Sequence, residues 1–457
     1  MNRRSAPSAR EIALEALARV DDGAYANIAL PALLDELDTQ FELDDREKHF
    51  ATELTYGTVR MRRACDWLVQ RHITRDADDE TLRVLHLGAY QLVFLKTAPH
   101  AAVSEMVELS PGWSKKFVNF ILRRVAEDPS PRWPDLATEL SYPDWIVRAL
   151  TNDLGPDKAR TTLEAMNRPA TVSVRDDGYI QDPASEMVAA AVGAKPGEKI
   201  LDLCAAPGGK ATYMAAQGAE VTAVDLHAHR AALITENIER LGLTNVTVIV
   251  GDATLMEFTP GSFDRVLVDA PCSGLGSLRR RPDARWRITE TDVVKLVKLQ
   301  RALMDVAVSA VAQGGTVVYS ACTLTRPESV GLDEWVGANH AELVASEPLA
   351  ERMWEPLGRG ARILPDETDG MVIFRYRKEF LPAVDPSDSF PEMPTADRGP
   401  DSEADHAPAA EAEPESETGP ASATGPASET ATDTDPETNA DFDSGLPVSA
   451  EAETLSP

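Results

Sequence analysis

The chain has few cysteines for its length. Its 457 residues include four, Cys65, Cys204, Cys272 and Cys322, and no two of them form a Cys-x-x-Cys pair. Structural zinc sites use closely spaced cysteines and secreted frameworks use paired ones, so we expect neither a metal site nor a disulfide-stabilised domain. Each cysteine is therefore either a small buried side chain or a reactive group.

The sequence also lacks a long apolar run. No stretch approaches the roughly 20 residues that a membrane-spanning helix needs. The N-terminus, Met1-Asn2-Arg3-Arg4-Ser5, leads into polar sequence instead of the apolar region of a signal peptide. We therefore expect a cytoplasmic protein with no membrane partner.

Basic residues are almost absent from the last part of the chain. Residues 385–457 contain 19 Asp and Glu and one basic residue, Arg398, in a chain of net charge −30. This composition buries too little apolar surface to offset the entropy of folding, so we expect a disordered acidic tail. Local basic runs elsewhere keep a nucleic-acid partner possible. They are Arg60, Arg62 and Arg63, then Lys115, Lys116, Arg123 and Arg124, then Arg279, Arg280, Arg281, Arg285 and Arg287.

The remainder is too long for one compact domain. Residues 8–128 show helical periodicity, with an apolar face from Ile12 to Val20, and predict an all-α domain. Prolines then mark a linker with short helices, 129–177, two of them within 142–166. Residues 178–380 alternate strands with helices, which is typical of an α/β domain with a mainly parallel sheet. Strands are expected at 199–203, 220–224, 246–250, 265–268, 316–319 and 371–376, and helices at 210–217, 228–241 and 290–312.

A glycine loop follows the first expected strand, where a backbone can approach a nucleotide-like ligand closely. A phosphate-binding P-loop is excluded, because its first glycine would fall at Cys204 and its Ser or Thr at Ala211. The loop residues expected to hold the cofactor are Cys204, Ala205, Ala206, Pro207, Gly208, Gly209 and Lys210.

Acidic residues end the next two strands. Asp225 stands where a ribose would be bound and Asp252 where an adenine amino group would lie. Either residue alone is as readily a helix cap. Together with the glycine loop they favour an adenosyl cofactor.

Two cysteines follow the fourth and fifth expected strands, in Asp269-Ala270-Pro271-Cys272 and Ser320-Ala321-Cys322-Thr323. A dehydrogenase has no need of this pair. Carbon 5 of cytosine is a poor nucleophile, and a thiolate that adds to carbon 6 activates it. The pattern therefore favours S-adenosylmethionine over a dinucleotide and predicts cytosine-5 methylation, and it leaves open which cysteine attacks. Cys65 and Cys204 are expected to be unreactive.

Five segments resemble the Sun/Fmu family of RNA cytosine-5 methyltransferases, and residues 8–128 resemble the domain of the antitermination factor NusB, which is fused to this catalytic domain in bacterial 16S ribosomal RNA methyltransferases. The resemblance implies a Rossmann-like class I methyltransferase domain with a mainly parallel, seven-stranded sheet, and S-adenosyl-L-methionine as cofactor. The segments are 181–185, 204–210, 269–276, 279–286 and 319–323.

The same resemblance implies roles for single residues. Cys322 corresponds to the nucleophile, Cys272 to the residue that assists product release, and Asp269 to one that contacts both the base and the cofactor. The implied partner is RNA, most often 16S ribosomal RNA, bound by a monomer without a metal. The residues expected to contact RNA are Arg279, Arg280, Arg281 and Arg285.

The chain departs from the family pattern at three places. Ala321 replaces a threonine before the nucleophile, Asp366 replaces a histidine, and the RNA-contacting subdomain is reduced to 170–180. The motifs encode the reaction and not the RNA sequence, so transfer RNA remains an alternative substrate. An RNA-binding ribosome assembly factor with incidental catalysis is an alternative of another class.

Overall fold

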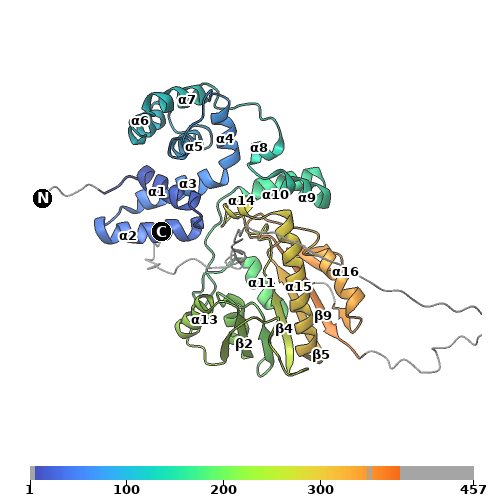
Figure 1. The fold of residues 1–457 in the computed structure, drawn as a ribbon. Helices are drawn as coiled ribbons and strands as arrows, with labels where there is room; N and C mark the ends of the chain where they lie inside the picture. The colour runs from blue at the N-terminus through green and yellow to red at the C-terminus, as the bar shows by residue number, and fades with distance from the viewer. Residues whose placement is uncertain (1–5, 347–348, 350–352, 381–457) are drawn as a thin grey trace, which may run out of the picture. The chain divides into compact units, whose positions relative to one another are not determined.

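The computed structural model describes residues 6–346, 349 and 353–380 (Figure 1). The predicted disorder of the acidic tail, 385–457, concerns residues outside those described. Within the described ranges, no helix is both long and apolar enough to cross a membrane.

The first part of the chain is helical, as its periodicity predicts. A capping box starts the first helix, because Ser8 Oγ accepts from the Glu11 N–H while the Glu11 carboxylate accepts from the Ser8 N–H. The predicted apolar face from Ile12 to Val20 is buried in a core shared by all seven helices of this region. They are α1 (Ala9–Asp21), α2 (Ala26–Phe41), α3 (Asp45–Arg60), α4 (Arg62–Gln70), α5 (Asp79–Val93), α6 (Pro99–Leu109) and α7 (Lys115–Glu127).

Three short helices follow, one more than the sequence predicted. The additional helix is capped by Asp135, whose carboxylate accepts from the Thr138 N–H at 2.7 Å. Tyr142 is fully buried among them and shares a small core with Leu275 and Ile288 from the α/β part. The segment 129–177 therefore packs against the α/β part. The helices are α8 (Leu136–Leu140), α9 (Asp144–Leu154) and α10 (Pro156–Met166).

One sheet contains every strand of the described α/β part. Its order is β3-β2-β1-β4-β5-β9-β8-β7, with β6 paired to β9. The first five strands of this path are parallel, and β9, β8, β7 and β6 pair antiparallel. The strands are β1 (Lys199–Asp202), β2 (Glu220–Asp225), β3 (Val246–Val250), β4 (Phe263–Asp269), β5 (Val311–Ala321), β6 (Leu343–Ala345), β7 (Glu355–Leu357), β8 (Gly360–Ile363) and β9 (Met371–Lys378).

All six strands expected from the sequence are present. The expected number of seven is wrong for the described residues, since the sheet has nine strands. The excess comes from β6, β7 and β8, which have three or four residues each. Strands this short carry too few alternations to be recognised from a sequence.

Helices cover both faces of the sheet. Val266 and Val268 of β4 face a core that includes buried residues of α15 and α16, whereas Leu267 between them faces a core that includes residues of α11, α12 and α13. Figure 1 shows α15 lying along β4 and β5. This doubly covered sheet brings the carboxyl ends of β1, β2, β4 and β5 to one edge. The helices are α11 (Pro183–Val192), α12 (Gly209–Ala216), α13 (Ala228–Arg240), α14 (Ala284–Arg287), α15 (Glu290–Ala310) and α16 (Val330–Asn339).

Candidate active site

The glycine loop joins β1 to α12 as predicted. Gly208 has φ of 101°, and a Cβ atom there would lie 3.2 Å from Ile234 of α13. A Cβ atom on Gly209 would lie 2.9 Å from the amide nitrogen of Gln181. Gly208 adopts the left-handed region that favours glycine, and a side chain at Gly209 would require the Gln181 side chain to move. The loop therefore presents backbone to a ligand at the start of α12.

The acidic residues at the ends of β2 and β3 both hold loop backbone. The Asp225 carboxylate accepts from the N–H groups of Ala206 at 3.2 Å and His227 at 3.1 Å. Asp252 accepts from the N–H and the hydroxyl of Thr254 at 2.8 and 2.6 Å. Asp225 thus joins the end of β2 to the glycine loop through the Ala206 N–H. The contacts of Asp225 and Asp252 with a ribose and an adenine remain predictions.

Asp202 at the end of β1 is a buried carboxyl group that the sequence reading did not single out. It is fully buried, and its Oδ2 has no hydrogen-bond partner among the described residues. Burial, followed by the charge of Asp269, raises the pKa of Asp202 to about 7. A cationic ligand beside it would favour the charged form. S-adenosylmethionine carries both an ammonium and a sulfonium group, so the residues present fit this cofactor.

The free energy of unfolding of the Asp202→Asn variant, minus that of the unchanged protein, is expected to increase as the pH rises from 5 to 8. Asp titrates near 3.9 in an unfolded chain, whereas Asp202 has a raised pKa of about 7 when folded. Between these values the unfolded chain has lost a proton that the folded protein retains, so the penalty of Asp202 grows with pH and is complete above pH 7. The difference in free energy of unfolding, measured in urea, should change by about 2 kcal/mol. A difference that is independent of pH would contradict this role of burial.

Asp269 ends β4 and lies between the glycine loop and β5. Lys210 Nζ is 2.5 Å from its Oδ2, and Ser320 Oγ donates to its Oδ1 at 2.6 Å. Both side chains of the ion pair are mostly buried, with 12% of each exposed. The pair fixes the Asp269 carboxylate at the edge of the sheet that carries the cysteines.

The two strand-end cysteines meet, although fifty positions separate them in the chain. The sulfurs of Cys272 and Cys322 are 3.3 Å apart, and Ser277 Oγ lies 3.9 Å from that of Cys322. Both cysteines are free thiols. The register between β4 and β5, which pairs Asp269 with Ser320, brings the two loops together. Both cysteines therefore lie just beyond the ends of the two strands that the sequence predicted before them.

The environments of the two thiols differ. The hydrogen bond with Cys322, and then burial, raise the pKa of Cys272 well above that of an ordinary thiol. Cys272 is 4% exposed, whereas Cys322 is half-buried. Cys272 therefore holds its proton strongly, and Cys322 is the more accessible sulfur of the pair.

The other two cysteines stand apart from this pair. Cys65 is fully buried in the helical core, and burial raises its pKa far above the usual range. Burial followed by the charge of Asp202 raises the pKa of Cys204. Neither environment favours a thiolate, in agreement with the expectation that both are unreactive.

A third loop supports the cysteines from the far end of the chain. A Cβ atom on Gly276 would lie 2.1 Å from the carbonyl oxygen of Gly370 and 3.0 Å from that of Cys322, so only glycine fits there. The Gly276 N–H donates to Cys322 O at 2.8 Å, and the Gly370 N–H donates to Gly276 O at 2.9 Å. The loops after β4 and β5 and before β9 thus form one backbone layer.

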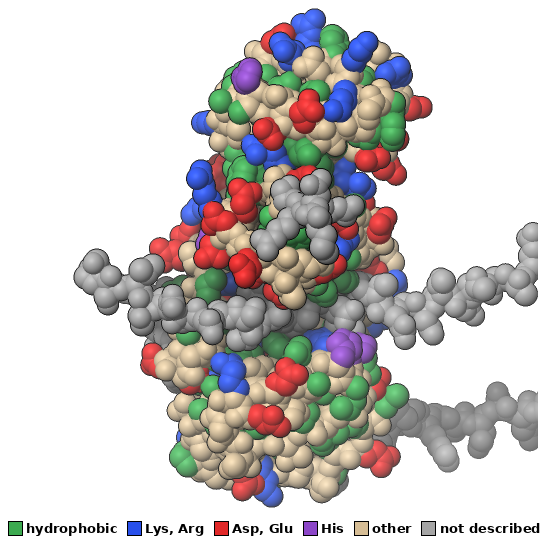
Figure 2. All heavy atoms as spheres, turned by 90° about the vertical axis from the view of Figure 1, so that its left-hand side faces the viewer, with side chains coloured by type: hydrophobic (Ala, Val, Ile, Leu, Met, Phe, Trp, Pro, Cys, Tyr) green, Lys and Arg blue, Asp and Glu red, His purple; other side chains and the backbone are tan. Residues whose placement is uncertain are grey.

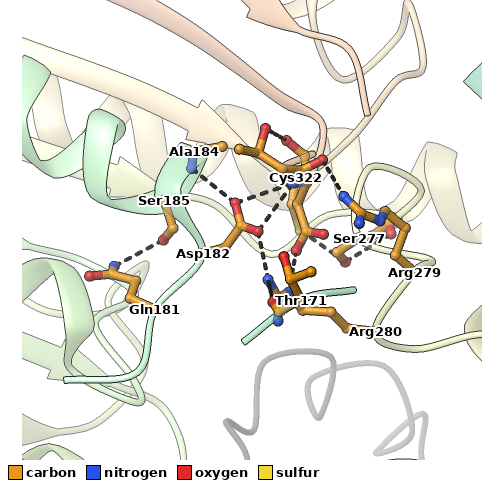
Figure 3. A network of polar contacts seen from close by, with 12 residues as sticks. Thr171, Gln181, Asp182, Ala184, Ser185, Ser277, Arg279, Arg280 and Cys322 are labelled. Carbon is orange, nitrogen blue, oxygen red and sulfur yellow. Dashed lines mark hydrogen bonds and ion pairs between the residues drawn. The ribbon is translucent and has the colours of Figure 1, made fainter. Parts of the chain in front are cut away.

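Asp182 and Arg280 connect this layer to the start of α11 (Figure 3). Arg280 donates to Asp182 at 2.7 Å and to Asp369 at 3.0 Å, and Asp182 also accepts from the N–H groups of Ala184 and Asp369. Burial, followed by the charge of Asp182, raises the pKa of Asp369 to about 6. The motif 181–185 therefore stabilises the loop before β9 through Asp182, a role that its sequence did not reveal.

Two of the four arginines expected to contact RNA are buried. Arg279 donates to the carbonyl oxygens of Thr368 and Pro169, both at 3.2 Å. Arg285 is fully buried and donates from Nη1 to Ser141 O at 3.1 Å and Asn167 Oδ1 at 2.8 Å. These guanidinium groups are held inside the protein and do not face a surface where RNA could reach them. Arg280 and Arg281 are half-buried.

The segment around α14 also contacts the N-terminal helices. Trp286 Nε1 donates to Val59 O and Arg287 Nη1 to Gly23 O, both at 2.8 Å. Asp283 accepts from the Ala26 N–H at 3.2 Å. The basic run 279–287, which follows Cys272, therefore serves largely in packing. Most of its charged groups bond to carbonyl oxygens and carboxylates of the same chain.

Arg285→Ala is expected to lower the free energy of unfolding by about 2–4 kcal/mol. The substitution empties a buried volume, removes two hydrogen bonds and removes a cation that lies 4.0 Å from the centre of the Tyr142 ring. Urea unfolding measures the loss. The matched control is Arg148→Ala, whose side chain is 57% exposed and pairs with Glu290 on the surface, and its loss should stay within about 0.5 kcal/mol. Equal losses for the two variants would contradict a packing role for Arg285.

The three departures from the family pattern lie outside the contacts between the cysteines. Ala321 is fully buried. Asp366 is exposed and pairs with Arg168 at 3.0 Å. The short segment 170–180 closes on itself through an antiparallel bridge between Val174 and Ile180.

Comparison with known proteins identifies both parts of the chain. Residues 189–377 match the family model described as 16S rRNA methyltransferase RsmB/F, and residues 7–127 match that of the NusB family. Ribosomal RNA small subunit methyltransferase B of Thermus thermophilus is 34% identical over 403 residues, which cover 81% of this chain and 96% of that protein. The probable methyltransferase B of Bacillus subtilis is 32% identical over 452 residues, 81% of this chain and 99% of that one.

The fold is also found in a solved structure. The crystal structure of PH0851 superimposes with a TM-score of 0.65 at 19% identity, and covers 83% of this chain and 100% of its own. At this identity the likeness concerns the fold alone. The fold likeness, the family models and the two relatives all agree with the geometry of the site described above. The chain belongs to the RsmB/F family of rRNA methyltransferases, carries a NusB-family domain at its N-terminus, and is an RNA methyltransferase that uses S-adenosyl-L-methionine.

Proposed function

We propose that this chain methylates carbon 5 of a cytosine in 16S ribosomal RNA through a covalent bond between Cys322 and carbon 6. The observation that carries the proposal is the 3.3 Å contact between the sulfurs of Cys272 and Cys322. Two thiols this close, one half-buried and one buried, supply both an attacking group and a proton-holding group. S-adenosylmethionine supplies an electrophilic methyl group when it is bound.

Cys322 is the nucleophile in this proposal. Its sulfur is the more accessible of the pair, whereas the raised pKa of Cys272 disfavours a thiolate at that residue. Addition of the thiolate to carbon 6 forms a sulfur–carbon bond and makes carbon 5 nucleophilic. Asp269, held by Lys210 and Ser320, lies at the same edge of the sheet and would contact the base.

Cys272 is the residue that assists release. Once carbon 5 carries both a hydrogen and a methyl group, that proton must leave before the bond from Cys322 to carbon 6 can break. As the carbon 5 proton passes to a base such as water and the sulfur–carbon bond breaks, its electron pair returns to Cys322 as a thiolate. Cys272, whose sulfur lies 3.3 Å from that of Cys322, would stabilise this thiolate by donating a hydrogen bond to it. A base that reacts in this way must leave the RNA helix, so the target lies in a loop or is flipped out.

The choice of ribosomal RNA rests on the names of the relatives, two of which are ribosomal RNA small subunit methyltransferases. Exposed basic residues of α7, namely Lys116, Arg123 and Arg124, suit a phosphate backbone better than the buried Arg279 and Arg285. Figure 2 shows Lys and Arg side chains at the upper end of the molecule, at the height of α6 and α7 in Figure 1. We propose that RNA contacts this helix and Arg281.

Bisulfite sequencing of ribosomal and transfer RNA, from cells with and without the gene, tests the proposal. Methylated cytosine resists deamination, so a 16S position protected in normal cells should become unprotected when the gene is absent. The gene should restore protection and a Cys322→Ala gene should not. An unchanged 16S pattern with an altered transfer RNA pattern would support the alternative substrate. Unchanged patterns in both, together with an assembly defect, would support the assembly factor.

A further inference from the structure

One fully buried carboxylate touches both cysteine loops. Glu328 lies between β5 and α16 and has no exposed surface. Its Oε1 accepts from the N–H of Ser273, the residue after Cys272, at 2.7 Å. Its Oε2 accepts from the hydroxyl of Thr323, the residue after Cys322, at 2.6 Å. A single side chain thus bonds to the residue that follows each thiol.

Further hydrogen bonds fix Glu328 itself. Thr325 Oγ1 donates to Oε2 at 2.7 Å and Gln300 Nε2 donates to Oε1 at 3.2 Å. Gln300 Nε2 also lies 2.9 Å from Pro271 O, on the other side of Cys272. The Tyr319 hydroxyl donates to the backbone oxygen of Glu328 at 2.8 Å. The carboxylate therefore receives four donors, which is the form in which a buried charge is tolerated.

We infer that Glu328 is the positioning residue that holds the loops of Cys272 and Cys322 at the separation in which their thiols meet. The inference rests on the function proposed above, and gives that reaction a residue outside the cysteines themselves. The β4–β5 register brings the two loops to the same edge, but each loop leaves its strand before or at its cysteine. Beyond the strand ends, the Gly276 N–H donates to Cys322 O, and Glu328 adds a side-chain link between the residues that follow the two cysteines.

The charge of Glu328 also affects one of the two thiols. It is among the groups that raise the pKa of Cys272, after the hydrogen bond and the charge of Cys322 and after burial. A neutral side chain of the same shape would remove this charge and require the hydroxyls of Thr323 and Thr325 to turn. Glu328→Gln is therefore the sharpest substitution, since it preserves volume.

The test uses the full chain, unmethylated 16S ribosomal RNA and S-adenosylmethionine with a labelled methyl group. Glu328→Gln should lower kcat about 100-fold, while KM for RNA and Kd for the cofactor stay within about threefold. Thr325→Val removes one of the four donors and should lower kcat about 10-fold. This second, milder variant covers the case in which Glu328→Gln does not fold.

Asp333→Asn is the matched control. Asp333 is also a buried carboxylate, but it bonds to Arg359 at 3.1 Å and to the Tyr376 hydroxyl at 2.8 Å, and not to either cysteine loop. Its kcat should stay within about threefold of the unchanged protein. A kcat unchanged in Glu328→Gln, or a loss of the same size in Asp333→Asn, would overturn the inference.

A second readout needs no RNA. Iodoacetamide labelling followed by peptide mass spectrometry gives the ratio of alkylation at Cys272 to that at Cys322. Loosening the loops should raise this ratio about 10-fold in Glu328→Gln. If the unchanged protein methylates no cytosine, the proposed function fails, and a changed ratio still supports the positioning role. An unchanged ratio overturns that role whatever the activity.

Discussion

Cys322→Ala is expected to lower turnover by about 10⁴-fold or more. Without the thiolate no bond to carbon 6 forms, and carbon 5 keeps the low reactivity of an ordinary cytosine. The Cys322 sulfur contacts Cys272 and Ser277, and the glycine loop that we propose holds the cofactor is fixed by other groups, among them Asp225. Cofactor affinity should therefore stay within about threefold, as measured by calorimetry.

Cys65→Ala is the matched control for the loss of a thiol. Cys65 is buried in the helical core, far in sequence from the catalytic motifs. The variant should lose about 1–2 kcal/mol of stability from the smaller side chain and retain turnover. Turnover within tenfold of normal in Cys322→Ala would contradict the covalent mechanism, whereas a similar loss in both variants would point to a general defect in folding.

Cys272→Ala is expected to trap the RNA. Cys322 can still add to carbon 6 in this variant, but the group that holds a proton next to its sulfur is gone. The adduct should accumulate because its breakdown slows more than its formation. On a denaturing gel, most of the enzyme should migrate with RNA after one turnover, while steady-state turnover falls by about 100-fold or more.

The double variant Cys272→Ala with Cys322→Ala separates the two roles. It should form no denaturant-resistant species, because the attacking sulfur is absent. Continued turnover of Cys272→Ala without an adduct would remove the release role. An adduct that survives in the double variant would show that another residue attacks the base.

Sequence patterns predicted the elements that depend on local chemistry. The alternation of apolar strands with helices predicted the parallel sheet, and the sequence placed Cys272 and Cys322 just beyond the ends of β4 and β5. These neighbouring parallel strands end at one edge of the sheet, where the two sulfurs meet. The glycine loop was recognisable from its local pattern, since Gly208 adopts the left-handed backbone region that favours glycine.

Features that depend on distant contacts were not predictable. A sequence shows the charge of Arg285 but not that Tyr142 and Asn167, from a different segment, enclose it. Glu328 follows Thr325 at the spacing of a capping box and therefore resembles an ordinary start of a helix, yet its carboxylate bonds to residues of both cysteine loops. Asp202 resembles any acidic residue at a strand end until its burial is known.

The central claim is that Cys322 bonds to carbon 6 of the target cytosine. RNA that contains 5-fluorocytosine retains this bond, because the fluorine at carbon 5 cannot leave as a proton does. Proteolysis and mass spectrometry of the unchanged enzyme, after reaction with this RNA and S-adenosylmethionine, identify the attached residue. We predict a nucleotide on the peptide that contains Cys322 and none on that of Cys272. A nucleotide on Cys272, or no adduct under conditions in which normal RNA is methylated, would contradict the account.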